Sequence, residues 1–360
     1  AVTTPVVLTN TATGLAKVEL RDFTETTFDL TLTAKNFADV PYTYNVDTTV
    51  LRDAIASMGG KFVNVTTSSS RSTSTVTAPE TITVPARGET NFTVTVDIST
   101  DGNIMFLGDT FVDGFVRLTH VGDTLPDIGI PFIGFYGDWG QLPIIDGLWT
   151  SDNFGETYYD WGGFLFTNPS TGGLSFFVGD DIYLTPGTDA GEATGRTSMM
   201  PLLSFLRNAE NVHYKVLDEA GTSIRTILTE QFARKTFLNG GRANPYRIIS
   251  RANWDGTLNG EVVPDGRYTY EITANVQGRE NQTYEMPVVI DTTAPVVTNI
   301  EYDAETRTIS FEAMDEYAGL NVFMFVADGE LLDDVVYGDD EETEYSFVLP
   351  EAYADAGKVE

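Results

Sequence analysis

The sequence predicts an all-β protein built from tandem β-sandwich domains, and three observations carry this prediction. Apolar and polar residues alternate over residues 28–34 and 92–98, the period of two that is typical of half-buried strands. Threonine and valine dominate these runs, and β-branched side chains suit a pleated surface. Helical periods are few: only residues 49–58, which end at a Gly-Gly pair, are expected to form a short helical turn or an inserted loop.

The chain has 360 residues, more than one hydrophobic core usually serves. We therefore expect a first domain over residues 1–147, a second over 148–291 and a third, truncated one over 292–360. In the first domain, a run of Ser and Thr at 66–75 is expected to form an exposed hairpin or loop. Residues 82–90 predict strand, turn, strand, and the apolar run at 130–136 is expected to be the last strand of this domain.

The second domain is predicted from aromatic strands at 163–166, 174–178, 212–218 and 267–274. Between the last two of these, residues 254–266 hold three Gly-containing turn signals and predict a tight loop. The third domain is expected to open at 291–297, where Pro295 stiffens the link and prevents edge pairing. Only about half a sandwich is visible after it, and the acidic run at 339–342 predicts a solvated turn.

The composition narrows the classes of partner. The chain carries 21 basic and 53 acidic residues, a formal charge of −32, and such a surface repels nucleic acid and anionic membranes. No apolar run is long enough to span a bilayer, and no cysteine is present for disulfides, thiolate metal sites or cysteine nucleophiles. No signal peptide stands at Ala1 and no sorting signal at Glu360, so we expect both ends to be cuts in a longer chain.

Several phrases of this sequence resemble one protein family in their order along the chain. The phrase at 130–140 resembles the end of the fibronectin type III-like domain of cell-envelope subtilases, the group that contains lactocepins and complement-degrading peptidases. The Trp-Asp-Gly at 254–256, the Val-Pro-Asp-Gly at 263–266 and the Tyr-Thr-Tyr at 268–270 are similar to immunoglobulin-like modules of these proteases and of flagellar hook-capping proteins. The Asp-Thr-Thr-Ala-Pro at 291–295 resembles the junctions of bacterial immunoglobulin-like arrays.

Subtilases carry a catalytic triad, and two phrases of this sequence resemble parts of it. Thr197-Ser198-Met199 resembles the nucleophile motif of subtilases, and Thr119-His120 resembles the histidine motif. Neither match has the context of the family motif. In subtilases the nucleophile and the histidine each begin a helix, whereas His120 is expected to end a strand. In addition, Arg196 stands where the nucleophile motif has a glycine before Thr197. The other histidine, His213, lies in an alternating strand and forms no metal-spacing motif. We therefore expect no catalytic residue.

One metal hypothesis remains. Hard oxygen ligands in a Gly-containing stretch suit calcium, although the alternating acidic pattern of a calcium loop is missing. The family often holds a Ser-Pro-Asn-Gly-Asp-Gly phrase in this region, and this chain departs from it. The calcium candidates are Asp180, Asp181, Asp189 and Glu192. An ordinary acidic loop is the alternative, and no cofactor is otherwise expected.

Aromatic residues gather near the first domain boundary. Exposed aromatic side chains can form a shelf that binds peptide or carbohydrate, and packing between domains is the alternative. The binding candidates are Trp139, Trp149, Tyr158 and Trp161.

The resemblance implies the non-catalytic part of an extracellular, cell-wall-associated subtilisin-like serine protease, a spacer or scaffold that also engages large protein substrates. Its partners would be a protease domain upstream in the same chain and protein substrates, without nucleic acid or membrane insertion. Two alternatives stay open: a surface adhesin or stalk of tandem immunoglobulin-like modules, and the accessory region of a carbohydrate-active enzyme.

Overall fold

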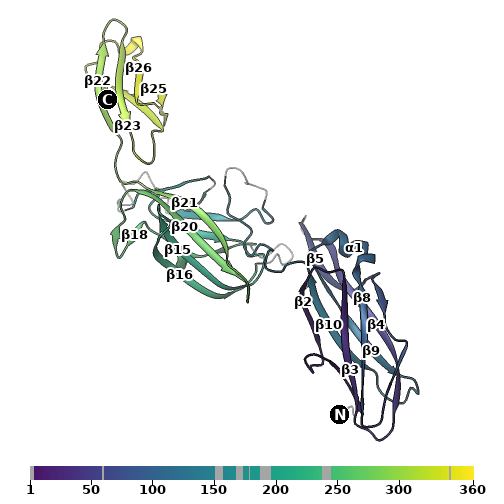
Figure 1. Ribbon diagram of the computed structural model, residues 1–360. Helices are drawn as coiled ribbons and strands as arrows, with labels where there is room; N and C mark the ends of the chain where they lie inside the picture. Colours follow the sequence, from purple (N-terminus) through teal and green to yellow (C-terminus); the bar gives the residue numbers. More distant parts are fainter. Residues whose placement is uncertain are drawn as a thin grey trace. The chain divides into compact units, whose positions relative to one another are not determined.

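A computed structural model describes residues 4–58, 61–150, 157–167, 173–177, 179–186, 196–236, 245–339 and 342–360. The chain divides into two compact units, residues 1–142 and 143–360, and each is described by itself. Strands dominate both units, as the alternation predicts, and the all-β fold class is confirmed (Figure 1).

The first unit holds two sheets. One has the strand order β1-β3-β8-β6, and the other the order β2-β10-β9-β4-β5 with β7 paired to β4. Adjacent strands are antiparallel except β2 and β10, which run parallel. The elements are β1 (Val6–Asn10), β2 (Val18–Phe23), β3 (Thr27–Asn36), β4 (Tyr42–Met58), β5 (Lys61–Arg71), β6 (Thr75–Thr77), β7 (Thr81–Val84), β8 (Glu89–Asp97), η1 (Ile98–Thr100), α1 (Gly102–Leu107), β9 (Thr110–His120) and β10 (Ile128–Tyr136).

Alternating side chains of both sheets build the core of this unit. Leu30 and Leu32 on β3 are fully buried, as are Val94 and Val96 on β8, and together with Phe132 on β10 they belong to one cluster. Each such side chain contributes about 1.5–3 kcal/mol of transfer free energy when it leaves water. The predicted strands at 28–34, 92–98 and 130–136 are therefore confirmed, including β10 as the last strand of the unit.

The expectation of a helical turn or inserted loop at 49–58 is wrong. These residues continue the long strand β4, which pairs with β9 on one side and β5 on the other. Residues up to Arg52 pair with β9, and residues from Leu51 to Met58 pair with β5; this pairing outweighs the helix propensity of Ala54 and Ala56. Gly114 on β9 makes the close approach feasible, since a Cβ there would collide with the Thr49 carbonyl oxygen and the Phe132 ring.

The second unit begins with two sheets around residues 163–290. One has the order β12-β11-β14-β17, and in the other β21, β20, β15 and β16 lie side by side with β13 outside β21 (Figure 1). The rings of Phe164 on β11 and Tyr270 on β20 meet 5.0 Å apart between the sheets, and Trp254 is fully buried. The elements are β11 (Gly163–Thr167), β12 (Leu174–Phe177), β13 (Ile182–Leu184), β14 (Met200–Leu203), β15 (Ala209–Asp218), β16 (Ser223–Ala233), β17 (Arg247–Ile248), η2 (Ser250–Ala252), β18 (Thr257–Leu258), β19 (Glu261–Val262), β20 (Gly266–Asn275) and β21 (Gln282–Ile290).

A separate core lies near the end of the second unit. The sheets β22-β23-β26 and β24-β25 meet through stacked rings of Phe325 and Phe347, whose centroids are 3.8 Å apart. The elements are β22 (Val296–Asp303), β23 (Thr308–Met314), β24 (Val322–Ala327), β25 (Glu330–Tyr337), β26 (Glu344–Val348) and η3 (Glu351–Tyr353). The division into two units falls at 142/143, so the three expected domains and their boundaries stay a prediction. None of the described helices is long and apolar enough to cross a membrane.

Candidate functional site

Two of the aromatic binding candidates stack on one another. The rings of Trp149 and Trp161 lie 6.2 Å apart, and Tyr246 packs against Trp161 at 5.0 Å. Trp149 is buried, with its indole Nε1 donating to the Thr157 hydroxyl at 3.1 Å, whereas Trp161 keeps 41% of its surface exposed. This arrangement presents one rigid, half-exposed indole face, which can stack on a ring or cover an apolar side chain.

The buried carboxylate of Asp146 holds the third candidate in place. Its two oxygens accept hydrogen bonds from the backbone N–H groups of Tyr158 at 2.8 Å and Tyr159 at 2.6 Å. The two tyrosine rings meet edge to face at 4.9 Å. Burial, together with the nearby Asp146 charge, raises the pKa of Tyr158, so this phenol stays neutral at physiological pH.

The fourth candidate lies in the other unit. Trp139 packs against Phe111 and Phe135 at 5.3 and 5.0 Å, and its backbone N–H donates to Asp22 at 2.9 Å. Residues 1–142 hold these contacts, whereas Trp149, Tyr158 and Trp161 belong to residues 143–360. The structure thus joins Trp149 with Trp161 and places Trp139 in a cluster of its own unit.

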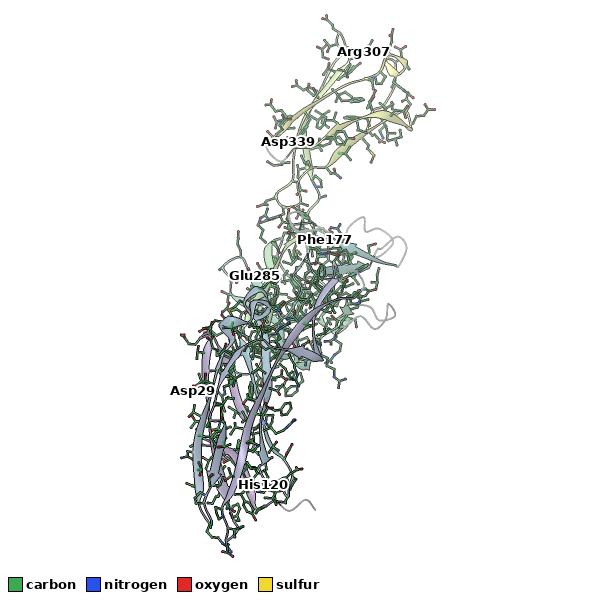
Figure 2. The ribbon with its side chains drawn as sticks, turned by 90° about the vertical axis from the view of Figure 1, so that its right-hand side faces the viewer. Asp29, His120, Phe177, Glu285, Arg307 and Asp339 are labelled. Atoms are coloured by element: carbon green, nitrogen blue, oxygen red, sulfur yellow. The ribbon has the colours of Figure 1, made fainter. Side chains whose placement is uncertain are left out.

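The two residues that resemble protease motifs, His120 and Ser198, lie in or next to β-structure. His120 ends β9, as expected, and its ring lies edge-on to Tyr42 and Tyr44 at 5.5 and 5.6 Å. Figure 2 shows this ring at one end of the first unit. Ser198 precedes an isolated bridge between Met199 and Trp254 in the second unit. Neither residue begins a helix, which is the context that the family motif requires.

The calcium candidates are only partly described. Asp180 is exposed, and Asp181 lies 3.6 Å from the guanidinium of Arg267, an ion pair that competes with a cation. Asp189 and Glu192 lie outside the described residues. Across the described part of the chain, no group of three or more His, Asp or Glu side chains is arranged to hold a metal ion.

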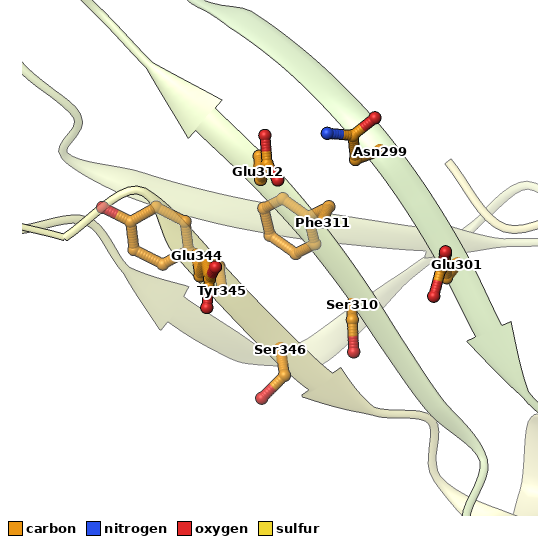
Figure 3. Close-up of a pocket in the computed structure, with 8 residues that line it drawn as sticks. All are labelled: Asn299, Glu301, Ser310, Phe311, Glu312, Glu344, Tyr345 and Ser346. Carbon is orange, nitrogen blue, oxygen red and sulfur yellow. The ribbon is translucent and has the colours of Figure 1, made fainter.

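An acidic hollow that the sequence analysis did not predict lies on the sheet β22-β23-β26. Its volume is about 510 Å³, and three carboxylates, Glu301, Glu312 and Glu344, face it from three different strands (Figure 3). Strand register explains the gathering, since Glu301 opposes Ser310 and Glu312 opposes Glu344. The hollow is a shallow, open face of solvated charges, and only the period-two pattern of each strand could have indicated it.

One comparison with known families decides the nature of the first unit. Residues 18–133 match the family model described as an Fn3-like domain. The match begins at the start of β2 and ends within β10, so it covers the core of the two-sheet sandwich. The first unit is an Fn3-like domain.

Relatives of known function extend the likeness beyond the Fn3-like domain. A PII-type proteinase of Lactococcus lactis subsp. cremoris is 29% identical over 342 residues, covering 86% of this chain and 17% of the relative. The C5a peptidase of Streptococcus pyogenes serotype M1 is 24% identical over 366 residues, covering 82% of this chain and 30% of the relative. The resemblance to these proteases is confirmed, and the chain spans a sixth to a third of their length.

One solved structure with a similar chain comes from an adhesion protein. The tetra-tandem repeat in the extending region of a large adhesion protein is 17% identical and covers 95% of this chain and 64% of that structure. Its TM-score is 0.23, a value too low to support an argument about fold or function.

A carboxylate inside the Fn3-like domain is structural. Asp101 is fully buried, and it accepts hydrogen bonds from the Ser72 hydroxyl at 2.7 Å and the Thr73 N–H at 2.9 Å while its other oxygen caps α1. Burial acts to raise the pKa of Asp101, but these hydrogen bonds outweigh it and lower the pKa to about 2. Arg52 lies 3.3 Å away and balances the charge. This carboxylate ties β5 and β6 to α1 and is not available for catalysis.

Proposed function

We propose that this chain is a non-catalytic accessory region of an extracellular, cell-wall-associated subtilisin-like serine protease. It acts as a spacer and scaffold between the protease domain and the envelope, and it offers an exosite to large protein substrates. Its partners are a protease domain upstream in the same polypeptide and protein substrates. The proposal includes three domains, at residues 1–147, 148–291 and 292–360.

One observation carries the proposal: similarity to proteinases runs through 86% of this chain while covering 17% of their length. A region that is similar over most of its own length to a small part of a large protease is best explained as a module of such a protease. The Fn3-like match over residues 18–133 supports the same interpretation, since sandwich domains of this kind host sites without requiring catalysis.

The surroundings of the motif-like residues support a role without chemistry. A serine nucleophile needs a histidine within hydrogen-bond reach and a third group that orients the imidazole. The Nδ1 of His120 instead lies 3.3 Å from the Thr124 hydroxyl, and its ring rests on tyrosines. His213, the other imidazole, lies 3.2 Å from the Thr229 hydroxyl on the edge strand β16. Both histidines therefore serve strand and turn packing.

The exosite is proposed at the face of Trp161. A rigid aromatic side chain buries a large area at small entropic cost, and such residues dominate binding energy at interfaces. Trp161 is held between Trp149 and Tyr246, so its indole is preorganised while 41% of its surface stays exposed. Trp149 is itself fixed by the hydrogen bond from its indole Nε1 to the Thr157 hydroxyl.

Hydrolysis by the purified chain tests the non-catalytic role. We expect no turnover of casein or of a chromogenic peptide by wild type or by Ser198→Ala. Turnover that disappears in Ser198→Ala would contradict the proposal. For the exosite, Trp161→Ala in the parent protease is expected to raise KM for a large protein substrate about tenfold and leave a short chromogenic peptide unaffected. Equal effects on both substrates would contradict it.

A further inference from the structure

The charge of this chain reverses sign over one segment. Residues 196–279 contain 11 of the 21 basic residues but only 8 of the 53 acidic ones. This segment is therefore weakly cationic in a chain whose formal charge is −32. A local cationic surface within a strongly acidic protein selects anionic groups that the rest of the molecule repels.

A surface pocket lies within this segment, where the ends of three strands meet. Its walls are the start of β15 with the residues before it, the end of β16 with the residues after it, and the turn that follows β20. The pocket has a volume of about 550 Å³ and is lined by Asn208, Ala209, Glu210, Phe232, Arg234, Lys235 and Gln277. The backbone N–H of Lys235 donates to the Asn208 side chain at 2.9 Å, which fixes the two walls together.

Phe232 lines this pocket with a strained backbone and an exposed ring. Its φ of 55° lies in the left-handed region, where a bulky aromatic residue is a true outlier. Its ring keeps 75% of its surface exposed, whereas the next residue, Ala233, is buried and pairs with Ala209. Strained residues of this kind cluster at ligand-binding sites, and an exposed apolar ring suits contact with a ligand.

Two cations, Arg234 and Lys235, follow Phe232 closely in the chain and line the same pocket. Arg234 and Lys235 are exposed, and no ion pair to either is present among the residues that the structure describes. Glu210, on the β15 wall, is the one carboxylate among the described residues that line the pocket. Because it repels an anion, an anionic group would bind at the end of the pocket formed by Arg234 and Lys235. Four other cations of the segment have acidic partners within 4 Å: Lys215 with Glu271, Arg225 with Asp255, Arg247 with Glu230, and Arg267 with Asp181.

We propose that this pocket binds an acidic peptide segment of another protein that carries an apolar side chain. The apolar side chain packs against the exposed ring of Phe232, and the flanking carboxylates pair with Arg234 and Lys235. The site shares no residue with the proposed exosite at Trp161, and its occupancy requires no protease domain. Its failure and that of the proposed function are therefore separate results.

The observations favour this occupant over two others. An anionic phosphate polymer would use Arg234 and Lys235 but gains nothing from Phe232 or from the Ala209 wall, and it adds charge next to Glu210. A second copy of this chain brings a formal charge of −32, and like charge opposes its approach at low salt. A peptide that combines carboxylates with an apolar side chain matches both halves of the pocket.

Fluorescence anisotropy with the purified 360-residue chain tests the site. The probe is a fluorescein-labelled peptide in which Asp and Glu flank a central Leu-Phe pair. Control peptides carry Ser-Ser at the centre, or Lys in place of Asp and Glu. We expect the first peptide to bind, with an affinity that falls as salt rises, and each control to bind at least about tenfold more weakly.

Matched variants separate binding from folding. Phe232→Gly removes the ring and suits the left-handed backbone, and it is expected to weaken binding about tenfold without lowering the melting temperature. Arg234→Ser with Lys235→Ser is expected to weaken binding to a similar degree. Arg251→Ser, an exposed cation outside the pocket, should leave affinity within about twofold.

Each of the following results would overturn the proposal: no binding of the acidic apolar peptide, equal binding of either control peptide, unchanged binding by both pocket variants, or binding of a soluble polyphosphate in place of the peptide. Self-association measured by sedimentation that is lost in Phe232→Gly, without peptide binding, would assign the pocket to a second copy and overturn it as well.

Discussion

The Asp101 carboxylate offers the sharpest test of the Fn3-like fold. Asp101→Asn keeps the size of the side chain but removes its charge and turns one acceptor oxygen into a donor. The amide then faces at least one of the donors that now bind the carboxylate, among them the Ser72 hydroxyl, the Thr73 N–H and the N–H groups of α1. A buried donor left without an acceptor costs about 1–3 kcal/mol.

The pKa gives a second measure of the same loss. The carboxyl titrates near 2 in the folded chain and near 3.8 when unperturbed. Its charge therefore contributes about 2 kcal/mol at neutral pH, because a lowered folded-state pKa stabilises the fold above the unfolded value. This contribution is lost as pH falls from 3.8 towards 2. Both measures describe the loss of the same hydrogen bonds, so they are not added, and we expect Asp101→Asn to lower the free energy of unfolding by about 2–3 kcal/mol at pH 7.

Hydrogen exchange followed by mass spectrometry measures this effect within the first unit. Amides of α1 and β9 in Asp101→Asn are expected to exchange about a hundredfold faster at pH 7. The difference from wild type should shrink below pH 3.8, where wild type also loses the charge. Asp39→Asn is the matched control, because Asp39 pairs with Arg87 on the exposed surface and its loss should not change exchange in β9. Equal exchange in Asp101→Asn and wild type at pH 7 would show that the Asp101 carboxylate does not stabilise the first unit.

Three further predictions concern the fold and use the same chain. Gly114→Ala should cost about 2–3 kcal/mol in urea unfolding of the first unit, since its Cβ would collide with β4 and the Phe132 ring; an unchanged midpoint contradicts this. Tyr270→Phe should lower the free energy of unfolding by about 1–2 kcal/mol, because the Tyr270 hydroxyl donates to the Ala252 carbonyl at 2.6 Å. Tyr214→Phe should leave stability unchanged or raise it, because the buried Tyr214 hydroxyl has no hydrogen-bond partner among the described residues. A larger loss of stability in Tyr214→Phe than in Tyr270→Phe, measured by calorimetry, would contradict this. Phe232→Gly should raise stability by about 1 kcal/mol, and a lower melting temperature would show that the ring serves the fold.

Local pattern was sufficient for most of the strands. The alternation at 28–34 placed Leu30, Leu32 and Ala34 inside, because side chains alternate across a strand whatever its partner. It failed at 49–58, where Ala54 and Ile55 carry no clear period. Their conformation depends on pairing with Val65 and Asn64 of β5, a tertiary contact that the local pattern does not show.

The candidate sites were harder to predict from the sequence than the strands, because they depend on contacts between residues far apart in the chain. The sequence named Trp139, Trp149 and Trp161 together, but their ring partners could not be read from spacing, and the structure separates Trp139 from the other two by unit. The positive φ of Phe232 has no local signature, since no glycine or asparagine marks it. The three glutamates of the acidic hollow meet only through the register of β22, β23 and β26.

Capture of the native polypeptide tests the central claim most directly. Cells that produce this chain would be treated with a biotinylated fluorophosphonate, which labels activated serines of serine hydrolases. The proteins would then be denatured and captured with an antibody raised against residues 18–133. We expect the captured polypeptide to be larger than these 360 residues and to carry the label on a serine outside them. Capture of an unlabelled polypeptide from cells whose other serine hydrolases are labelled, or a label on Ser198, would contradict it.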